Sequence, residues 1–339
     1  MYFLDANKTQ KCDILLTTTL AWLSRLICRA TESDISHASL MVDSHALIDS
    51  TGDGVQARNI HRIEYEDKCS IHLMRFKGTL SNEQKNKIES FARGKIGMRY
   101  NTTEAIKSGF VQHRILSPKD DGRRMFCSRL VAEAYEFAGI KLVDNPQYCT
   151  PDDLKNSPSL YEIMDIAIPI PYDISSLKIQ SLPNFDEKMR DVTNDLLSRI
   201  RMLDDSVETL TDIVDFLLKH PEKDGDVLDA YQESGYLTLE DEIFAQTSYL
   251  YNSAQFMVHY MEKFPKYAKI GHDEDTSRFE QNLTIYKELY NQTHFKTFEV
   301  LVNLYTKLVE HSDLRKKTCI EVLRSLDKNP AFKRMMGLG

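Results

Sequence analysis

The sequence predicts a chain of two parts, the first built from mixed short strands and helices and the second all α-helical. Three observations predict this division. Short runs of alternating apolar residues, joined by turn residues, fill much of 13–80. From Asp186 onward, apolar residues instead recur at spacings of three and four. Between these regions, residues 167–185 contain three prolines and little periodicity, which places the boundary there and gives domains of 1–180 and 181–339.

Strands are expected in the first part wherever apolar and polar residues alternate. Residues 13–16 begin one strand, and residues 70–76 alternate as another. Between them lie two β-like runs, 37–42 and 46–50, joined by the turn residues of 43–45. We therefore expect these two runs to pair as a hairpin.

Helical spacing predicts several helices in the same part. Residues 82–96 form a polar amphipathic helix with Ser81 as its N-cap. Residues 127–138 form a helix with one apolar face, which Gly139 ends as a C-cap residue. Further helical segments are expected over 21–30, over part of 102–116, and from the capping residue Thr150 onward.

The second part has the apolar periodicity of a helical bundle. One stripe runs from Met189 to Leu217 and predicts a single long helix that ends at His220-Pro221. Short connections between the helices predict antiparallel neighbours whose apolar stripes form the core of the bundle. The remaining helical patterns cover about 237–264, about 277–311, and 314 to about 335.

The charge balance argues against a nucleic-acid partner. The chain has 339 residues, and its net charge of −8 is poorly suited to binding duplex nucleic acid. Residues 1–180 contain 23 basic and 23 acidic residues, so the whole acidic excess lies in 181–339. None of the six cysteines forms a CxxC pair, so we expect no zinc knuckle and no redox motif.

The first residues give an expectation about location. No basic region followed by an apolar run is present, so no secretory signal is expected. The apolar stretch 14–28 is too short and too polar to span a bilayer, so no transmembrane segment is expected. Six cysteines are too few for a disulfide scaffold, which favours a reducing compartment. We expect a cytoplasmic protein, or one exported by a secretion system that needs no signal peptide.

One cysteine has a position suited to nucleophilic chemistry. Cys127 stands at the first turn of the predicted helix 127–138, within the run RRMFCSRLV. Free backbone N–H groups and the positive end of the helix dipole stabilise a thiolate there. The same groups can stabilise the oxyanion that forms when a thiolate attacks a carbonyl. Since a free cysteine is often only a small core residue, a nearby base is the next requirement.

A histidine and a carboxylate lie on the predicted hairpin. His37 begins the first of its strands, and Asp49 lies within the otherwise apolar run 46–50. A hairpin can place Asp49 beside His37 on the same face, where the carboxylate would orient the imidazole and favour its charged form. Each residue also fits an ordinary polar position at a strand end or sheet edge. His45 is a competing histidine, but it falls in the turn.

Six strings within about residues 11–155 carry a family resemblance: DILLTTT, LSRLICRATESDISHASLMV, ALIDS, GMRYN, FCSRLVAEAYEFAG and CTPDDL. Together they resemble the YiiX/YebB-type permuted papain-like cysteine hydrolases. These belong to the NlpC-type superfamily, on the branch shared with lecithin:retinol acyltransferase-like proteins. In that branch the catalytic histidine precedes the cysteine, and a polar residue about a dozen positions after the histidine completes the triad. His37, Asp49 and Cys127 match this order.

The resemblance implies an α+β fold: a circularly permuted papain-like domain with a small antiparallel sheet, followed here by the all-α helical bundle. It implies that Cys127 is the nucleophile, His37 the base and Asp49 the residue that orients the base, with an acyl-enzyme intermediate and no cofactor. Tyr100, in the string GMRYN, matches a motif near the active-site groove and is expected either to contact substrate or to pack. The neighbours of the nucleophile, Ser128 and Arg129, are expected to take part in substrate binding.

Two departures from the family pattern stand out. The family usually has Gly-Asp where this chain has Cys12-Asp13, which concerns a turn. Arg129 stands where an acidic or small residue is expected, so it can alter substrate preference. The basic run within 107–124, just before the nucleophile, either attracts an anionic substrate or is simply solvated.

Three functions remain open from the sequence. The first is hydrolysis of an amide or peptide bond through the triad. The second is lipid acyl hydrolysis or acyl transfer of the lecithin:retinol acyltransferase-like type, or thioester cleavage, on a peptide or acyl-lipid substrate. The third is a non-catalytic interaction protein whose helical bundle binds a protein partner.

Overall fold

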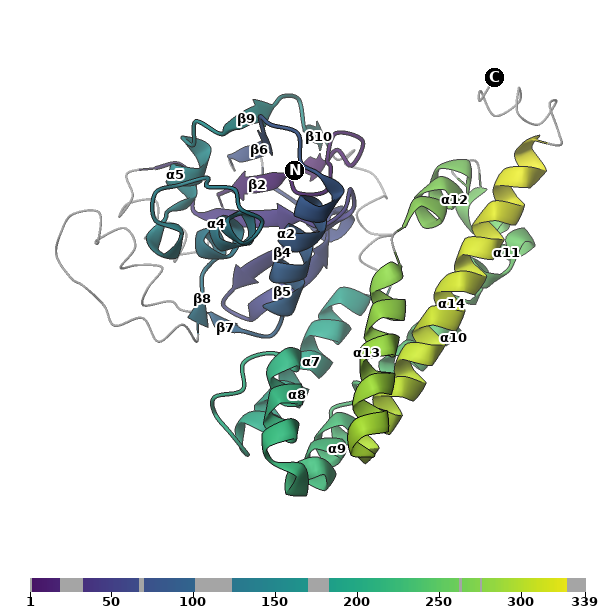
Figure 1. Ribbon diagram of the computed structural model, residues 1–339. Coiled ribbons are helices and arrows are strands. Elements are labelled where there is room, and N and C mark those ends of the chain that lie inside the picture. Colours follow the sequence, from purple (N-terminus) through teal and green to yellow (C-terminus); the bar gives the residue numbers. More distant parts are fainter. Residues whose placement is uncertain are drawn as a thin grey trace. The chain divides into compact units, whose positions relative to one another are not determined.

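The computed structural model describes residues 2–18, 33–66, 70–100, 124–169, 183–261, 264–274 and 276–327 (Figure 1). The chain divides into two compact units, residues 1–216 and residues 217–339. Several expected features lie outside the described residues. They are the helices over 21–30 and 102–116, the basic run before Arg124, two cysteines (Cys28 and Cys69), and the chain beyond 327.

The centre of the first unit is a six-stranded sheet whose neighbouring strands are all antiparallel (Figure 1). The expected hairpin is present, with Ser39 opposite Asp49 and Leu40 opposite Ile48. The strands follow one another in space in the order β5 (Gly54–Asn59), β4 (Ala46–Thr51), β3 (His37–Met41), β2 (Ile14–Thr17), β6 (Ile71–Phe76) and β9 (Leu160–Ile163).

Both faces of this sheet are buried, but by different elements. Against one face pack helices α4 (Cys127–Phe137) and α2 (Asn82–Gly94), and Leu40, Ile48 and Leu130 belong to the same apolar cluster. Against the other face lie β1 (Tyr2–Leu4) and its partner β10 (Ala167–Pro169). Because consecutive residues of a strand point to opposite faces, β3 and β4 supply apolar side chains to both layers.

The helices that pack around the sheet begin at the residues expected from sequence, and α2 and α4 end within two residues of the expected ends. Ser81 and Gln84 form a capping box at the start of α2. Gly139 has a φ of 78° and ends the turn after α4, a backbone conformation that glycine adopts without strain. A second capping box, Thr150 with Asp153, begins the short helix α5 (Pro151–Lys155).

The Cys12-Asp13 turn explains one departure from the family pattern. Cys12 has a φ of 73°, a left-handed conformation in which glycine is favoured. The Asp13 carboxylate accepts hydrogen bonds from Arg75 Nε and Nη2, both at 2.7 Å, and from the Gln10 N–H. The turn is therefore held by side chains, and a cysteine takes the place where the family usually has glycine.

The long helix expected over 186–217 is interrupted, so that prediction was wrong. Helix α7 (Phe185–Arg201) ends there, and α8 (Leu210–Lys219) begins after a turn. The Thr209 hydroxyl accepts a hydrogen bond from the Asp212 N–H at 3.3 Å and the Asp212 carboxylate accepts one from the Thr209 N–H at 2.8 Å, which starts the second helix. The apolar stripe gave no sign of this turn, because Leu203 continues its spacing although that side chain is 37% exposed.

Helix α7 packs within the first unit. The Asn59 N–H at the end of β5 donates to the Asp186 carboxylate at 2.9 Å, and Arg62 donates to the Pro183 carbonyl at 2.7 Å. The glycine at 97 has a φ of 93°, and an added Cβ would lie 2.2 Å from a methyl carbon of Leu197. The first compact unit thus includes α7, whereas the domain boundary at 180/181 stays a prediction.

The second unit is all α-helical, as expected, but its helices are divided differently. The segment 237–264 is broken at Asn252, which caps the next helix, and at Met261, whose φ is 48°. Two helices were expected over 277–311 and 314–335, but the break between the observed helices lies at His294, whose backbone is left-handed. The helices are α9 (Asp224–Glu233), α10 (Leu239–Gln246), α11 (Ser253–Tyr260), α12 (Phe264–Asp273), α13 (Ser277–Thr293) and α14 (Lys296–Asp327).

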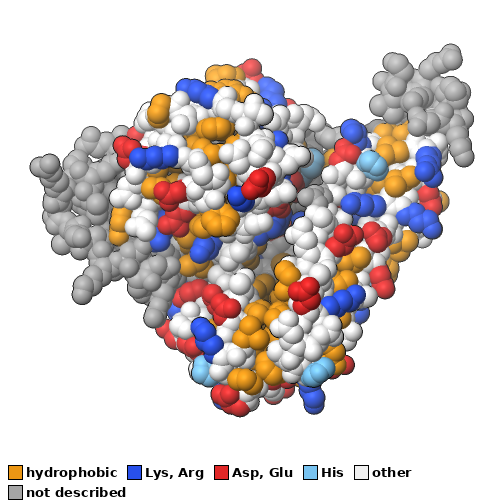
Figure 2. All heavy atoms as spheres, in the orientation of Figure 1, with side chains coloured by type: hydrophobic (Ala, Val, Ile, Leu, Met, Phe, Trp, Pro, Cys, Tyr) orange, Lys and Arg blue, Asp and Glu red, His pale blue; other side chains and the backbone are white. Residues whose placement is uncertain are grey.

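The surface of the second unit carries charged side chains of both signs. On the face drawn in Figure 2, acidic and basic side chains are interspersed over α13 and α14 rather than gathered by sign. Within the described residues, no helix has the length and apolar character needed to cross a membrane.

Candidate active site

The first turn of α4 places Cys127 where its sulfur meets unpaired backbone N–H groups. The N-cap residue Phe126 makes no side-chain cap, and no acidic residue stands in the first turn. The chain around this start is anchored from two sides. The Ser50 hydroxyl donates to the Met125 carbonyl at 2.6 Å, and the Ser128 hydroxyl donates to the Cys149 carbonyl at 2.7 Å. The positive end of the helix is thus open to the sulfur.

The hairpin brings His37 and Asp49 together. The His37 Nε2 lies 3.2 Å from Asp49 Oδ2, because Asp49 stands opposite Ser39, two residues along β3 from His37. The imidazole also lies near the Cys127 side chain, whose negative charge raises the pKa of His37. With Nε2 facing Asp49, Nδ1 is the ring nitrogen left for the sulfur. The three side chains singled out from sequence therefore form one contiguous array, whereas His45 instead stacks on His61.

The charges in this array stabilise one another. Burial alone would lower the pKa of His37, but the negative charge of Cys127 and the hydrogen bond to Asp49 outweigh burial and raise that pKa. Burial alone would raise the pKa of Cys127, but the charge and hydrogen bond of His37, with the backbone N–H groups of Ala38 and Ser128, lower it. The arrangement favours a thiolate–imidazolium pair.

The other described cysteines behave in the opposite way. Burial raises the pKa of Cys12 to about 12, and it also raises the pKa of Cys149 and of Cys319. None of these three has a histidine among the groups that lower its pKa. Of the four cysteines that the structure describes, Cys127 alone thus has a lowered pKa.

Asp49 has a second partner that the sequence reasoning missed. Its side chain is 2% exposed, and Oδ2 accepts from Arg58 Nη1 at 3.2 Å as well as facing His37. The other oxygen, Oδ1, is buried with no hydrogen-bond partner among the described residues. A signal for Arg58 was present, because the polar residues Gln56 and Arg58 alternate along β5 and share a strand face.

The three residues expected to bind substrate differ in their burial and in the partners of their side chains. Tyr100 is close enough that burial and the negative charge of Cys127 raise the pKa of its hydroxyl. The Ser128 hydroxyl is held by Cys149, and the Arg129 side chain is buried and donates to Glu133 at 2.8 Å. Contact of these three residues with a substrate stays a prediction.

A buried ion cluster fixes the backbone next to Tyr100. The Glu208 carboxylate, 4% exposed, accepts from the Arg99 guanidinium and, at 3.3 Å, from Arg201. Arg201 also donates to the Gly97 carbonyl at 2.9 Å. The turn between α7 and α8 thus holds the strand that carries Tyr100.

No group of three or more His, Cys, Asp or Glu side chains in the described ranges is arranged to hold a metal ion.

Comparison with known proteins shows that the first part of the chain is similar to a family of enzymes. Residues 8–160 match the model of the permuted papain-like amidase enzymes of the YaeF/YiiX type, the C92 family. A crystal structure of the metalloprotein yiiX from Escherichia coli O157:H7 aligns over 46% of this chain and 97% of its own, with 22% sequence identity and a TM-score of 0.36. No curated protein matches the chain significantly.

The family match confirms the resemblance and the fold class expected from sequence. It spans somewhat less than half of the chain, and it includes the hairpin with His37 and Asp49 and the start of α4 with Cys127. Residues 8–160 are therefore similar to the permuted papain-like amidases, and this similarity supports a cysteine hydrolase.

Proposed function

We propose that this protein is a cysteine hydrolase that cleaves an amide or peptide bond through Cys127, His37 and Asp49. The observation that carries the proposal is the opposite electrostatics of the cysteines. Cys127 has a lowered pKa beside His37, while burial raises the pKa of Cys12, Cys149 and Cys319. A buried thiol that packs only as a core residue has no need of an imidazole partner.

The first half-reaction forms an acyl-enzyme. The Cys127 thiolate attacks the amide carbonyl carbon, a carbon–sulfur bond forms, and the backbone N–H of Cys127 at the open helix start stabilises the oxyanion. The His37 imidazolium then gives its proton to the amide nitrogen as the carbon–nitrogen bond breaks. An amine leaves, and the acyl group remains on the sulfur as a thioester.

The second half-reaction returns the free enzyme. The neutral imidazole of His37 takes a proton from water, and the hydroxide attacks the thioester carbonyl. The carbon–sulfur bond breaks, a carboxylic acid leaves, and the thiolate–imidazolium pair forms again. Asp49 holds the ring in position throughout and stabilises its charged form.

The amide class is favoured over lipid acyl transfer because the matching family is one of amidases. Both reactions pass through the same thioester, so substrate choice needs its own test. The enzyme is offered a library of acyl-peptide amides and, separately, phospholipid vesicles. We expect cleavage of an amide to release a free amine. Cleavage of the lipid ester alone would contradict the amidase assignment.

The role of Cys127 is tested with a matched pair of cysteine variants. Cys127→Ala should abolish amide cleavage while the far-UV circular dichroism stays that of the parent. Cys319→Ala removes a buried thiol of the second unit and should keep the activity. Activity in the first variant would overturn the proposal.

A further inference from the structure

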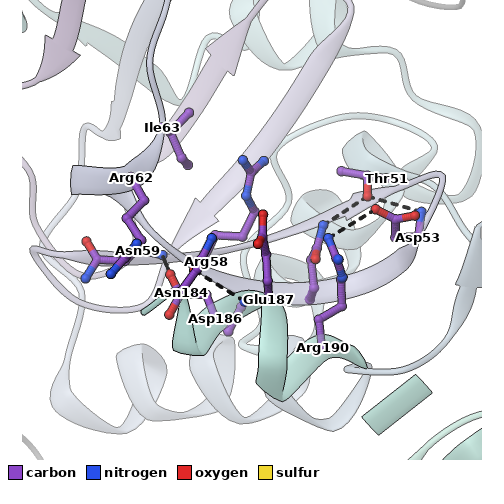
Figure 3. Close-up of a pocket in the computed structure, with 12 residues that line it drawn as sticks. Thr51, Asp53, Arg58, Asn59, Arg62, Ile63, Asn184, Asp186, Glu187 and Arg190 are labelled. Carbon is purple, nitrogen blue, oxygen red and sulfur yellow. Dashed lines mark hydrogen bonds and ion pairs between the residues drawn. The ribbon is translucent and has the colours of Figure 1, made fainter. Parts of the chain in front are cut away.

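A polar cavity of about 280 Å³ lies in the first unit, between β5 and the first turn of α7 (Figure 3). Its walls come from strand residues such as Gln56 and Arg58, and from helix residues such as Glu187 and Arg190. The triad residues do not line it. The cavity is smaller than the usual pocket for a drug-sized ligand, so its size fits a smaller molecule.

Arg58 presents a fixed positive charge to this cavity. One nitrogen, Nη1, is held at 3.2 Å by the buried carboxylate of Asp49. A guanidinium has five N–H donors, and its other donors have no partner among the described residues. The side chain is 37% exposed, so these donors are accessible. Because Asp49 holds the group in place, an anion could bind it with little loss of side-chain entropy.

The opposite wall presents a negative charge. Glu187 stands in the first turn of α7, and its charge acts on Arg190, but its carboxylate makes no ion pair with any described residue. The two other acids of the cavity are engaged, since Asp186 accepts from the Asn59 N–H at 2.9 Å and Asp53 lies 3.4 Å from Arg190. Glu187 is therefore the carboxylate that remains for a cation.

The mixture of charges selects the ligand class. Three carboxylates and three arginines line the cavity, so its charges balance, which favours a ligand without net charge over a multiply charged anion such as phosphate. Much of the remaining wall is polar, which disfavours a large apolar ligand. A small molecule that carries both a carboxylate and an ammonium group satisfies both walls.

We propose that this cavity binds a zwitterion of amino-acid size, whose carboxylate is held by Arg58 and whose ammonium group is held by Glu187. Figure 3 draws both side chains among the residues that line the cavity. The site goes beyond the proposed hydrolysis and does not depend on it.

The test measures binding to the full chain carrying Cys127→Ala, so that hydrolysis plays no part. Each common L-amino acid is titrated by calorimetry, with acetate and methylamine as ligands of one charge only. We expect saturable binding of at least one amino acid, at an affinity that neither single-charge ligand reaches. The same amino acid should raise the melting temperature, since it binds the folded state.

Matched variants locate the site. Glu187→Gln removes the proposed ammonium partner and should weaken binding by about tenfold or more, as expected for loss of a charged hydrogen bond. Glu280→Gln makes the same change in the first turn of α13 and should leave binding unchanged. The proposal is overturned if no amino acid binds, if acetate or methylamine binds as tightly, or if Glu187→Gln binds with unchanged affinity.

Discussion

The first turns of α4 and α7 differ in what lies against their free backbone N–H groups. Both helices begin with backbone N–H groups that have no partner within the helix. At α7, the Asn184 side chain accepts from the Glu187 N–H, and two acids stand in the first turn. At α4, no side chain caps the helix, the first turn has no acid, and Cys127 is the first residue.

The difference shows what the active site requires. An N-cap side chain stabilises a helix by about 1 kcal/mol, and α2, α5 and α7 in the first unit each have one. A cap or an acid at α4 would occupy the N–H groups that a thiolate and an oxyanion need. An acid would also repel the thiolate and raise the pKa of Cys127. Under the proposed mechanism, the uncapped start of α4 lacks the stability that a cap would add and leaves its N–H groups for the Cys127 sulfur.

The largest effect is expected from His37→Ala. Without the imidazolium, the pKa of Cys127 should rise, and amide cleavage should fall by about 10³-fold, as expected for loss of a general acid–base group. The rate of cleavage and the rate of iodoacetamide labelling at neutral pH are measured together. Unchanged labelling of Cys127 would show that the helix start alone activates the thiol.

Asp49→Asn should have the next largest effect. The amide can still fill the space beside His37, but it no longer stabilises the imidazolium, so we expect a loss of about 10²-fold in kcat/KM. The variant also frees Arg58 from its only described carboxylate partner. A matched change, Asp53→Asn, leaves the array intact and should retain activity.

The pH dependence follows from the two shifted groups. The pKa of Cys127 is lowered, so activity should rise with pH below the ordinary thiol range as the thiolate forms. The pKa of His37 is raised to about 10, so activity should fall above that pH as the imidazolium loses the proton that the leaving amine needs. On each side of the pH optimum, kcat/KM should change by about tenfold per pH unit. A profile of kcat/KM that peaks near pH 6 and falls by pH 8 would contradict this assignment.

The smallest effect is expected from removing the N-cap of α7. Asn184→Ala removes the cap of α7 and should destabilise the protein by about 1 kcal/mol, measured by urea unfolding. The same variant should leave the labelling of Cys127 unchanged. Ser81→Ala, which removes the cap of α2, should give a similar loss. A change in the reactivity of Cys127 in either variant would contradict the conclusion that the capped helix starts act on stability alone.

The sequence predicted the local elements of the first unit well. The strands at 37–41 and 46–51 and the helix from Cys127 lie close to the expected positions. These elements follow from period-two alternation, turn residues and a glycine C-cap, all of which act locally. The contact between His37 and Asp49 followed from the hairpin, since pairing two strands fixes which residues share a face.

The sequence did not predict contacts that depend on distant packing. The apolar spacing continued through Leu203, although that side chain is exposed in the turn between α7 and α8. That turn is fixed by Arg201 and Glu208 reaching the strand at Arg99, which periodicity cannot show. Arg58 was missed for a similar reason, because its role depends on Asp49 being buried beneath it.

The central claim is that Cys127 is held as a thiolate by His37, and the pH profile of alkylation tests it most directly. The rate of iodoacetamide labelling is measured at each cysteine by peptide mass spectrometry across a range of pH. We predict that Cys127 reacts with a midpoint below 9.0, the ordinary pKa of a cysteine thiol, and that His37→Ala moves the midpoint upward. A midpoint at or above 9.0 in the parent protein would contradict the claim.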